Sequence, residues 1–191
     1  QAPSLAALSR KKYPSPNAKK IGEPAPPKGL KLKLFRAPRY FYHLKLGFLF
    51  GERFIHLKHW GRKSGQLKET VIEVIDQDKT NGVLYSASGF GTQSQWFKNI
   101  SVNNAVFVTL RNTEFEASAS VLSADEATEV LLRYVKVHPN SIKSVARLSG
   151  YEMDGSEKDI IAFSQIIKIV KFTLHERINS LQHYPHRDHQ S

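Results

Sequence analysis

Strand-like runs joined by tight turns occupy the middle of this 191-residue chain, and they restrict its fold more than any other feature. β-Branched residues crowd together over 71–75, and polar and apolar residues alternate over 115–121. Both patterns are typical of strands. The Asn-Gly pair at 81–82 and the Arg-Asn pair at 111–112 fall between such runs, where they favour hairpin turns. Because hairpins join antiparallel neighbours, a largely antiparallel sheet is expected.

The pattern predicts about six strands with helices inserted among them. The strands are predicted at 53–60, 68–77, 83–88, 105–110, 113–122 and 166–174, and the helices at 94–102, 123–138, 140–148 and 155–165. Ser94 and Ser123 are the expected N-caps of the first two helices. Since helices and strands do not alternate regularly, the fold class is mainly β with attached helices (α+β), a small β-barrel and not a doubly wound sheet.

Three regions are expected along the chain. Residues 1–33 hold six of the nine prolines among scattered lysines, which predicts a disordered tail. Residues 34–176 form the barrel domain, and they begin with an amphipathic segment at 34–50. We interpret this segment as a helix packed on its own domain, with a lid or an element lying on an anionic membrane as the functional alternatives. Residues 177–191 are a polar tail.

The charge of the chain predicts an anionic partner. A formal net charge of +11 suits nucleic acid, an acidic membrane surface or a strongly anionic cofactor. The chain has no cysteine, which excludes a disulfide framework, a thiolate metal site and a cysteine nucleophile. Histidines at 183, 186 and 189 lie in the polar tail without acidic partners apart from Asp188, so no metal site is expected.

The run HWGRKSG at 59–65 is the strongest candidate for holding an anion. Its two glycines permit tight turns and close approach to main-chain N–H groups. Arg62 offers a planar fork of donors, Lys63 a point charge and Ser64 a hydroxyl. The alternative interpretation is a basic hairpin turn exposed to solvent. The run lacks the longer Gly-rich stretch and the following helix of a nucleotide-binding P-loop.

Several runs, in this order and spacing, resemble the deazaflavin-dependent nitroreductase-like oxidoreductases. They are GRKSG at 61–65, SASGFG at 86–91, WFKN at 96–99, Tyr134 with His138-Pro139, and GYEMDG at 150–155. The resemblance spans residues 35–175. It implies a split β-barrel and reduced 8-hydroxy-5-deazaflavin, coenzyme F-420, as hydride donor. That coenzyme carries a phosphodiester and an oligoglutamate tail, which agrees with the anionic partner that the charge predicts.

The resemblance also implies a set of site residues. The loop at 61–65 would hold the phosphate, Lys58 would pair with the anionic tail, and the run at 86–91 would lie against the ring. The expected cofactor-binding residues are Lys58, His59, Trp60, Gly61, Arg62, Lys63, Ser64, Gly65, Ser86, Ala87, Ser88, Gly89, Phe90, Gly91, Trp96 and Asn99. Tyr134 or His138 would donate a proton to the product or orient a water.

Five positions depart from the family pattern. His59-Trp60 stands where small hydroxyl residues are common, Glu69 where a basic residue is common, Phe97 where tyrosine is common and Asn104 where proline is common. Trp60 and Phe90 are bulky beside the expected ring pocket, which would restrict the substrate or turnover.

The implied function is hydride transfer from reduced deazaflavin to an electron-poor small molecule, such as an enone, a quinone or a nitro compound. The alternatives are an FMN-binding split-barrel oxidoreductase and a non-catalytic split-barrel protein that binds a cofactor or a lipid. Nucleic acid is not an expected partner, because the charge is divided between a tail and one loop without an aromatic–basic motif. A cytoplasmic protein is expected, with peripheral membrane contact through 34–50 as a further hypothesis. Related folds often pair as homodimers, and the sequence leaves that assembly open.

Overall fold

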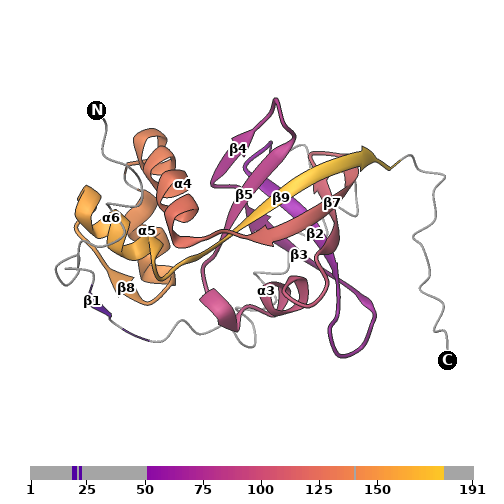
Figure 1. Cartoon of the computed structure of the whole chain (residues 1–191), viewed down its shortest axis with the longest axis horizontal. Coiled ribbons are helices and arrows are strands. Elements are labelled where there is room, and N and C mark those ends of the chain that lie inside the picture. The colour runs from indigo at the N-terminus through magenta and orange to yellow at the C-terminus, as the bar shows by residue number, and fades with distance from the viewer. Residues whose placement is uncertain (1–18, 21, 23–50, 140, 179–191) are drawn as a thin grey trace.

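Seven antiparallel strands form the main sheet of the protein (Figure 1). The computed structural model describes residues 19–20, 22, 51–139 and 141–178. The strands are β2 (Phe54–Trp60), β3 (Leu67–Glu73), β4 (Asp76–Asp78), β5 (Val83–Ser88), β6 (Ala105–Leu110), β7 (Thr113–Val121) and β9 (Lys168–Arg177). Their order is β3-β2-β6-β7-β9-β5-β4, and every neighbouring pair is antiparallel. The predicted fold class, a mainly β split barrel with attached helices, is confirmed.

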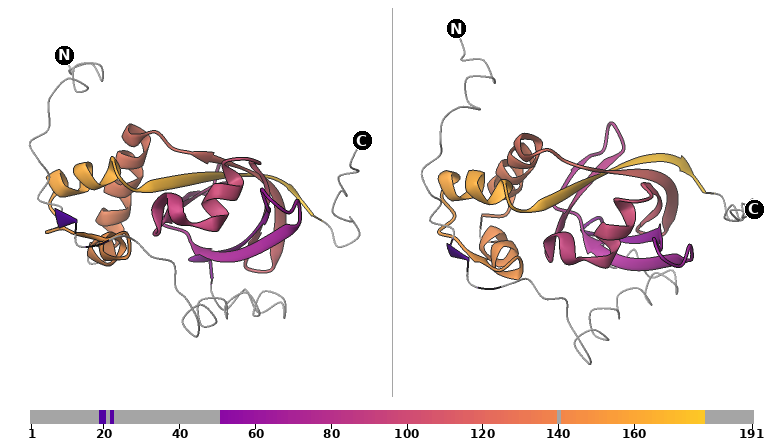
Figure 2. Two further views of the ribbon diagram at one scale, coloured as in Figure 1. Left: turned by 90° about the horizontal axis from the view of Figure 1, so that it is seen from below. Right: turned by 60° about the horizontal axis from the view of Figure 1, so that its bottom comes forward.

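A bend at Val74-Ile75 curls the sheet into a barrel (Figure 2). The two edge strands, β3 and β4, are consecutive in the chain and are separated only by these two residues. The N–H of Val74 donates to Arg53 O beside β2 (2.8 Å), and the N–H of Ile75 donates to Tyr85 O on β5 (2.8 Å). The prediction of one strand over 68–77 was therefore wrong in one respect: the run is divided, because it leaves one edge of the sheet and joins the other.

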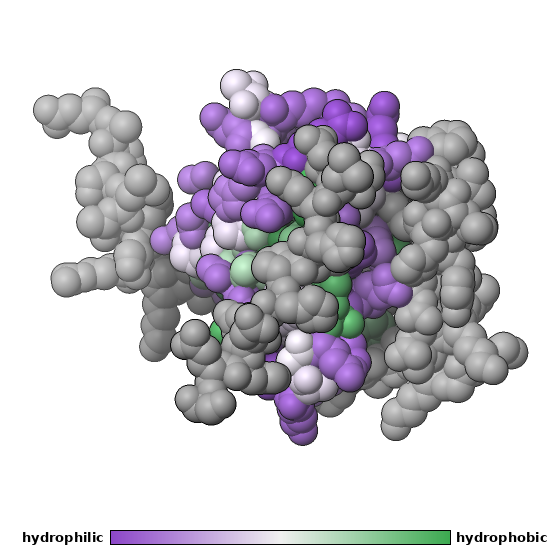
Figure 3. All heavy atoms as spheres, turned by 90° about the vertical axis from the view of Figure 1, so that its right-hand side faces the viewer, coloured by the Kyte–Doolittle hydropathy of each residue, from purple (hydrophilic) through white to green (hydrophobic). Residues whose placement is uncertain are grey.

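The inward face of the sheet and one helix form the barrel core. Helix α3 (Gln95–Ile100) follows the short 3-10 helix η2 (Gly91–Gln93) and packs Phe97 and Ile100 into this core. The other buried members alternate along the strands: Ile55, Leu57, Ile72, Leu84, Val106, Val108, Ala117, Ala119, Val170 and Phe172. Seen from the barrel side, the described surface is mostly hydrophilic, with only small hydrophobic areas exposed in that view (Figure 3).

Three helices gather beside the barrel and form a second core (Figures 1 and 2). They are α4 (Ala124–Val137), α5 (Ser141–Leu148) and α6 (Glu157–Ser164). As predicted, Ser123 caps α4, and it forms a capping box with Glu126. A two-stranded sheet joins β1 (Lys19–Lys20) to β8 (Tyr151–Glu152). We refer to α4–α6 and their shared core as the helical layer.

Two predictions about the ends of the chain concern residues that the structure largely does not describe. The amphipathic segment at 34–50 lies outside the described residues, and so does the polar tail from 179 onward. Within the predicted N-terminal tail, the described pair Lys19–Lys20 is the β1 strand that pairs with β8. Within the described part of the chain, no helix combines the length and the apolar character that crossing a bilayer requires.

Candidate functional site

The loop between β2 and β3 is held in shape by its own hydrogen bonds. Gly61 N donates to Gln66 O (2.8 Å) and Gly65 N donates to Gly61 O (2.7 Å). Gly65 has a φ of +64°, and this conformation is unfavourable for residues that carry a Cβ. A Cβ on Gly61 would lie 2.7 Å from Ser64 Oγ and 3.2 Å from Gln66 O, so a larger residue there would have to displace both atoms.

Two consecutive N–H groups of this loop are left to bind a ligand. The main-chain N–H groups of residues 61, 62, 65 and 66 donate within the protein. Those of Lys63 and Ser64 have no hydrogen-bond partner among the described residues, and both residues are exposed. Neighbouring main-chain donors beside an ammonium group and a hydroxyl suit an oxyanion. The loop therefore has the donors of a phosphate site.

Asn99 fastens the loop to α3. Its Oδ1 accepts from the main-chain N of Arg62 (3.2 Å) and from Arg62 Nη1 (2.9 Å). Arg62 Nη1 also donates to Gln95 Oε1 (3.1 Å). On its other side, Asn99 Nδ2 lies 3.1 Å from His59 Nδ1. The guanidinium of Arg62 is thus turned toward α3, where the phosphate interpretation had expected it to face a ligand.

His59 is buried and neutral. Burial, and secondarily the charge of Lys68, lowers the pKa of His59 from its ordinary 6.5 to about 4. Because Asn99 Oδ1 accepts from Arg62, the amide of Asn99 turns its Nδ2 toward His59. His59 Nδ1 therefore accepts, and the single ring proton lies on Nε2. The position where the family commonly has a small hydroxyl residue carries a neutral acceptor in this chain.

The end of β5 meets the start of α3. Ser88 Oγ lies 2.7 Å from Gly91 O and 2.8 Å from Ser94 Oγ, so the turn at 89–94 is bonded to the strand. Ser94 stands at the N-cap position of α3, but its hydroxyl does not cap the helix, contrary to prediction. Since Gln95 follows directly and contacts Arg62, α3 brings the two predicted loops together.

Only part of the run at 86–91 is a loop. Ser86, Ala87 and Ser88 are strand residues opposite β9, in agreement with the strand predicted over 83–88, and only 89–91 lie beyond it. Successive strand residues direct their main-chain groups to opposite edges. Tyr85 O accepts from Ile75 N on the β4 side, which places the main-chain groups of Ala87 on that same edge, beyond the last residue of β5 that β4 pairs with. Ser86 Oγ is fully buried and has no hydrogen-bond partner among the described residues.

Lys68 belongs to the site, and sequence reasoning missed it. It is the cross-strand neighbour of His59 and therefore lies on the same face of the sheet. Its Nζ donates to Gln66 Oε1 (3.0 Å), beside the loop. The strand register could have revealed it, because a turn closed between 61 and 66 pairs 59 with 68. Gln95, the second partner of Arg62, was missed as well, and no local pattern identifies it.

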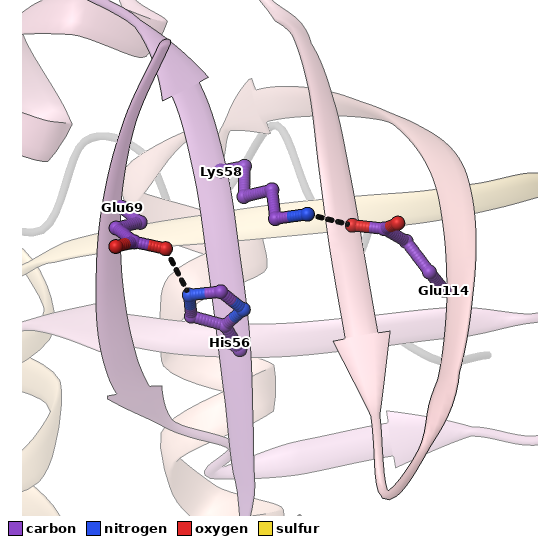
Figure 4. A network of polar contacts seen from close by, with 4 residues as sticks. All are labelled: His56, Lys58, Glu69 and Glu114. Carbon is purple, nitrogen blue, oxygen red and sulfur yellow. Dashed lines mark hydrogen bonds and ion pairs between the residues drawn. The ribbon is translucent and has the colours of Figure 1, made fainter. Parts of the chain in front are cut away.

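Strand alternation places Lys58 on the opposite face of β2 from His59. Its Nζ forms an ion pair with Glu114 Oε1 on β7 at 2.7 Å (Figure 4). On the same outer face, His56 Nε2 lies 2.9 Å from Glu69 Oε2, which gives the unusual acidic residue at 69 a partner. Strand alternation also places Trp60 on this outer face. A role for Lys58 with the coenzyme tail would require its ion pair to be exchanged.

Trp96 is a half-buried member of the barrel core. Its ring lies 6.1 Å from that of Phe97 and 6.4 Å from that of Phe172, measured between centroids. Edge-on and tilted contacts at these distances are favourable aromatic packing. Phe90, the other aromatic residue of the site, is half-buried and immediately precedes η2.

Tyr134 and His138 lie in the helical layer, apart from the loop. Tyr134 is buried in the second core, and burial, opposed by a hydrogen bond with Ser141, raises the pKa of its phenol. The charges acting on it include those of Glu73 and Arg53, at the end of the β2–β3 hairpin farthest from the loop. The seven residues of each strand span roughly 20 Å at about 3.3 Å per residue, and this length separates the hairpin end near Tyr134 from the loop. His138 is exposed, with its ring centroid 5.2 Å from that of Tyr134.

The comparisons identify the family. The family model of F420H(2)-dependent quinone reductase matches residues 43–148, more than half of the chain, and the protein belongs to this family. A structure of an F420-H2 dependent reductase (FDR-A) is similar at 15% identity and a TM-score of 0.46, over 64% of this chain and 95% of its own. The protein Atu2129 from Agrobacterium tumefaciens str. C58 is similar at 12% identity and a TM-score of 0.48, over 82% of this chain and 60% of its own. No curated protein sequence matches the chain.

Among the described residues, His, Cys, Asp and Glu form no group of three that could hold a metal ion.

The hydrogen bonds that meet at α3 define the candidate site, which consists of the β2–β3 loop, the N-terminal part of α3 and the end of β5.

Acidification is expected to destabilise the protein through His59. Its pKa is about 4 when folded and 6.5 in its ordinary state, so the unfolded chain binds the extra proton between these values. The free energy of unfolding therefore falls as the pH drops from 6.5 to 4, by an amount on the order of 3 kcal/mol, and levels off below. Urea denaturation across this range measures the effect. The His59→Asn variant, which keeps an acceptor but does not titrate, should lose less stability over the same range, and equal slopes would refute the assignment.

Substitution of Gly61 is expected to open the loop. The Cβ in Gly61→Ala displaces the Ser64 hydroxyl and presses on Gln66 O, which should cost about 1–3 kcal/mol in thermal unfolding. Gly61→Ala/Ser64→Ala relieves the closer contact and should recover part of that loss. At Gly65 nothing lies within 4 Å, so only the backbone strain of a positive φ opposes Gly65→Ala, and Gly65→Asn should be milder still. A Gly61→Ala protein as stable as the parent would contradict this description of the loop.

Proposed function

We propose that the protein is an oxidoreductase that transfers a hydride from reduced deazaflavin coenzyme to an electron-poor small molecule. The observation that carries this proposal is the meeting, at α3, of a loop with free anion donors and a strand end with free main-chain groups. Membership of the F420H(2)-dependent quinone reductase family supports the same conclusion and favours a quinone as the acceptor. An enone or a nitro compound is the further proposal for the acceptor.

The residues of the loop fit the anionic half of this coenzyme. The N–H groups of Lys63 and Ser64, the Ser64 hydroxyl and the ammonium groups of Lys63 and Lys68 would hold the phosphodiester. Charge-assisted hydrogen bonds of this kind are the stronger ones, about 1.5–3 kcal/mol each. Gly61 and Gly65 shape the loop, and Arg62, His59 and Asn99 brace it.

The end of β5 would face the ring. The main-chain groups of Ala87 and the N–H groups of Gly89, Phe90 and Gly91 would face the ring at an unpaired edge, while the carbonyls of Phe90 and Gly91 accept within the protein. The unsatisfied hydroxyl of Ser86 lies in the same strand, where a polar ring atom or a water would satisfy it. Lys168 is the cross-strand neighbour of Ser88, which adds a cation beside this turn. Trp96 would support the ring side of the pocket from α3.

The coenzyme, when bound, supplies the hydride from its reduced ring. The chain binds the anionic tail, orients the ring and restricts the approach of water. Tyr134, with the pKa of its phenol raised by burial, keeps its proton at neutral pH and remains a proposed donor to the product, together with His138. Their place in the helical layer means that they would act on an acceptor lying between that layer and β5.

The two alternatives use the same loop. FMN also carries a phosphate and a flat ring, so the donors of Lys63 and Ser64 would suit it too. The interpretation as a non-catalytic carrier rested on the bulk of Trp60 and Phe90 beside the expected ring pocket. Because Trp60 lies on the outer face of β2, only Phe90 would be beside the ring, which weakens this interpretation. A homodimer and a cytoplasmic location with peripheral membrane contact remain predictions.

Binding and turnover of the coenzyme test this proposal. The protein should quench the fluorescence of oxidised deazaflavin coenzyme, and the quenching should saturate. In a separate assay, the protein should oxidise reduced coenzyme when menadione is added. Lys63→Ala should weaken binding about tenfold or more and reduce its salt dependence, because one charge-assisted contact is lost. Lys158→Ala, on the exposed surface of α6, is the matched control and should bind as the parent does.

Titration with FMN in parallel separates the alternatives. Binding of FMN alone would reassign the protein to the flavin branch, and binding of neither would end the cofactor proposal. Saturable deazaflavin binding without oxidation by menadione, an enone or a nitro compound would favour the carrier.

A further inference from the structure

We propose that His59 is a positioning residue that acts through Asn99: its ring accepts from the Asn99 amide, which holds the main-chain N–H and Nη1 of Arg62 against α3 and so presents the free N–H groups of Lys63 and Ser64 to the coenzyme phosphate. This proposal rests on the proposed function for the identity of the ligand. The positioning itself rests on hydrogen bonds within the chain and can be tested without a ligand.

The three side chains form one directed chain of hydrogen bonds. His59 Nδ1 accepts from Asn99 Nδ2 (3.1 Å), and Asn99 Oδ1 accepts from Arg62 Nη1 (2.9 Å) and from the Arg62 main-chain N (3.2 Å). His59 and Asn99 are 3% and 5% exposed, so the bond between them is shielded from water, while the bonds to Arg62 are part-buried. An amide has one carbonyl oxygen and one NH2 group, and it can serve Arg62 in this way only while its NH2 group has an acceptor on the other side.

His59 supplies the acceptor that this direction of the amide requires. If position 59 lacked an acceptor, the buried NH2 group of Asn99 would be left unsatisfied, at a cost that favours displacement of the Asn99 side chain. Turning the amide would not remove this cost, because it would present NH2 to Arg62, donor against donor, so both bonds between Asn99 and Arg62 would be lost. The loop would then keep only its internal bonds and the contact of Arg62 with Gln95.

This arrangement divides the work among the basic residues of the loop. The Arg62 side chain and main-chain N–H are both engaged by α3, so they place the loop and contribute a fixed charge to it. Lys63 follows with a free N–H, and Lys68 stands on the same sheet face as His59. A site of this kind is preorganised, because the loop is held before the phosphate arrives.

Three variants of the strand isolate the role of His59. His59→Leu removes the acceptor and fills the space with an apolar side chain among buried Leu57 and Ile55 neighbours on the same face. His59→Asn keeps an acceptor at the position of Nδ1. His56→Leu is the matched control, because His56 is also 3% exposed and lies on the same strand but faces outward.

The ligand-free readout is 15N NMR of the Arg62 side chain and of the Lys63 and Ser64 amides. In the parent and in His59→Asn, the Arg62 Nε–H signal should be sharp and the loop amides ordered. In His59→Leu these signals should broaden or take random-coil shifts, while His56→Leu leaves them unchanged. An ordered loop in His59→Leu, or a disordered loop in His59→Asn when that variant is folded, would overturn the proposal.

The coupling to Asn99 distinguishes positioning from a general packing effect. His59→Leu should raise the Kd for oxidised deazaflavin coenzyme about tenfold, and His59→Asn should return it to within about threefold of the parent, where tenfold corresponds to about 1.4 kcal/mol. In an Asn99→Ala background, His59→Leu should cause no further change, because the chain of bonds is already broken. Additive losses would show that His59 acts by packing alone, and this result would overturn the proposal.

The outcomes for the two proposals can be told apart. If the parent protein binds no deazaflavin coenzyme, the proposed function fails, and the NMR comparison still decides whether His59 positions the loop. If the coenzyme binds and the His59 variants bind it equally well, the function stands and the positioning role fails. If His59→Leu does not fold, Asn99→Ala against His59→Asn applies the same test at the next bond: the proposal then requires a loosened loop in Asn99→Ala alone.

Discussion

The barrel depends on one stretch of chain supplying both edges of the sheet. Strands β3 and β4 are consecutive, and Val74 and Ile75 between them bond in opposite directions, to Arg53 beside β2 and to Tyr85 on β5. An open antiparallel sheet would expose two rows of unpaired main-chain groups. Here β4 covers the edge of β5 from Val83 to Tyr85, and the rest of β5 continues beyond it. The unpaired remainder of β5 is where the proposed ring site lies, so the closure of the barrel also defines its opening.

Helix α3 turns this opening into a site. It begins beside Ser88 at the end of β5 and receives Arg62 from the β2–β3 loop at Gln95 and Asn99. The loop and the strand end are separated by more than twenty residues in sequence, and this six-residue helix sets their relative position. Its inward residues, Phe97 and Ile100, are part of the barrel core. The packing that stabilises the fold is therefore the same packing that positions the anion donors.

Local patterns predicted the elements well and the site in part. The strands at 83–88 and 105–110 agree residue for residue, because clear turns bound them, and the capping box at Ser123 is a local signal. The division at Val74-Ile75 was missed, since the residues that force it, Arg53 and Tyr85, come from two other parts of the chain. For the site, the glycine and lysine pattern of the loop is a local signal, whereas the hydrogen bonds of Asn99 to this loop were not anticipated, since Asn99 was expected among the cofactor-binding residues.

Long-range contacts explain what the sequence did not reveal. Arg62 was predicted to be a ligand contact because its donors suit phosphate, and the sequence did not reveal that residues 37 and 33 positions away engage its Nη1. Lys58 was grouped with the loop by proximity in sequence, whereas the two-residue period of a strand places it on the outer face with Glu114. The same period, applied to β3, would have put Lys68 beside His59. Register, more than composition, decides which basic residues can reach the site.

We propose that the loop and the end of β5 form one site for an anionic deazaflavin. Mapping of 15N amide shifts during titration with oxidised coenzyme tests this claim most directly. We expect the amides of Lys63, Ser64 and Gly89–Gly91 to shift together at the same coenzyme concentrations, while those of the outer face around Lys58 stay in place. Shifts confined to the outer face or to the helical layer, with the loop unaffected, would contradict it.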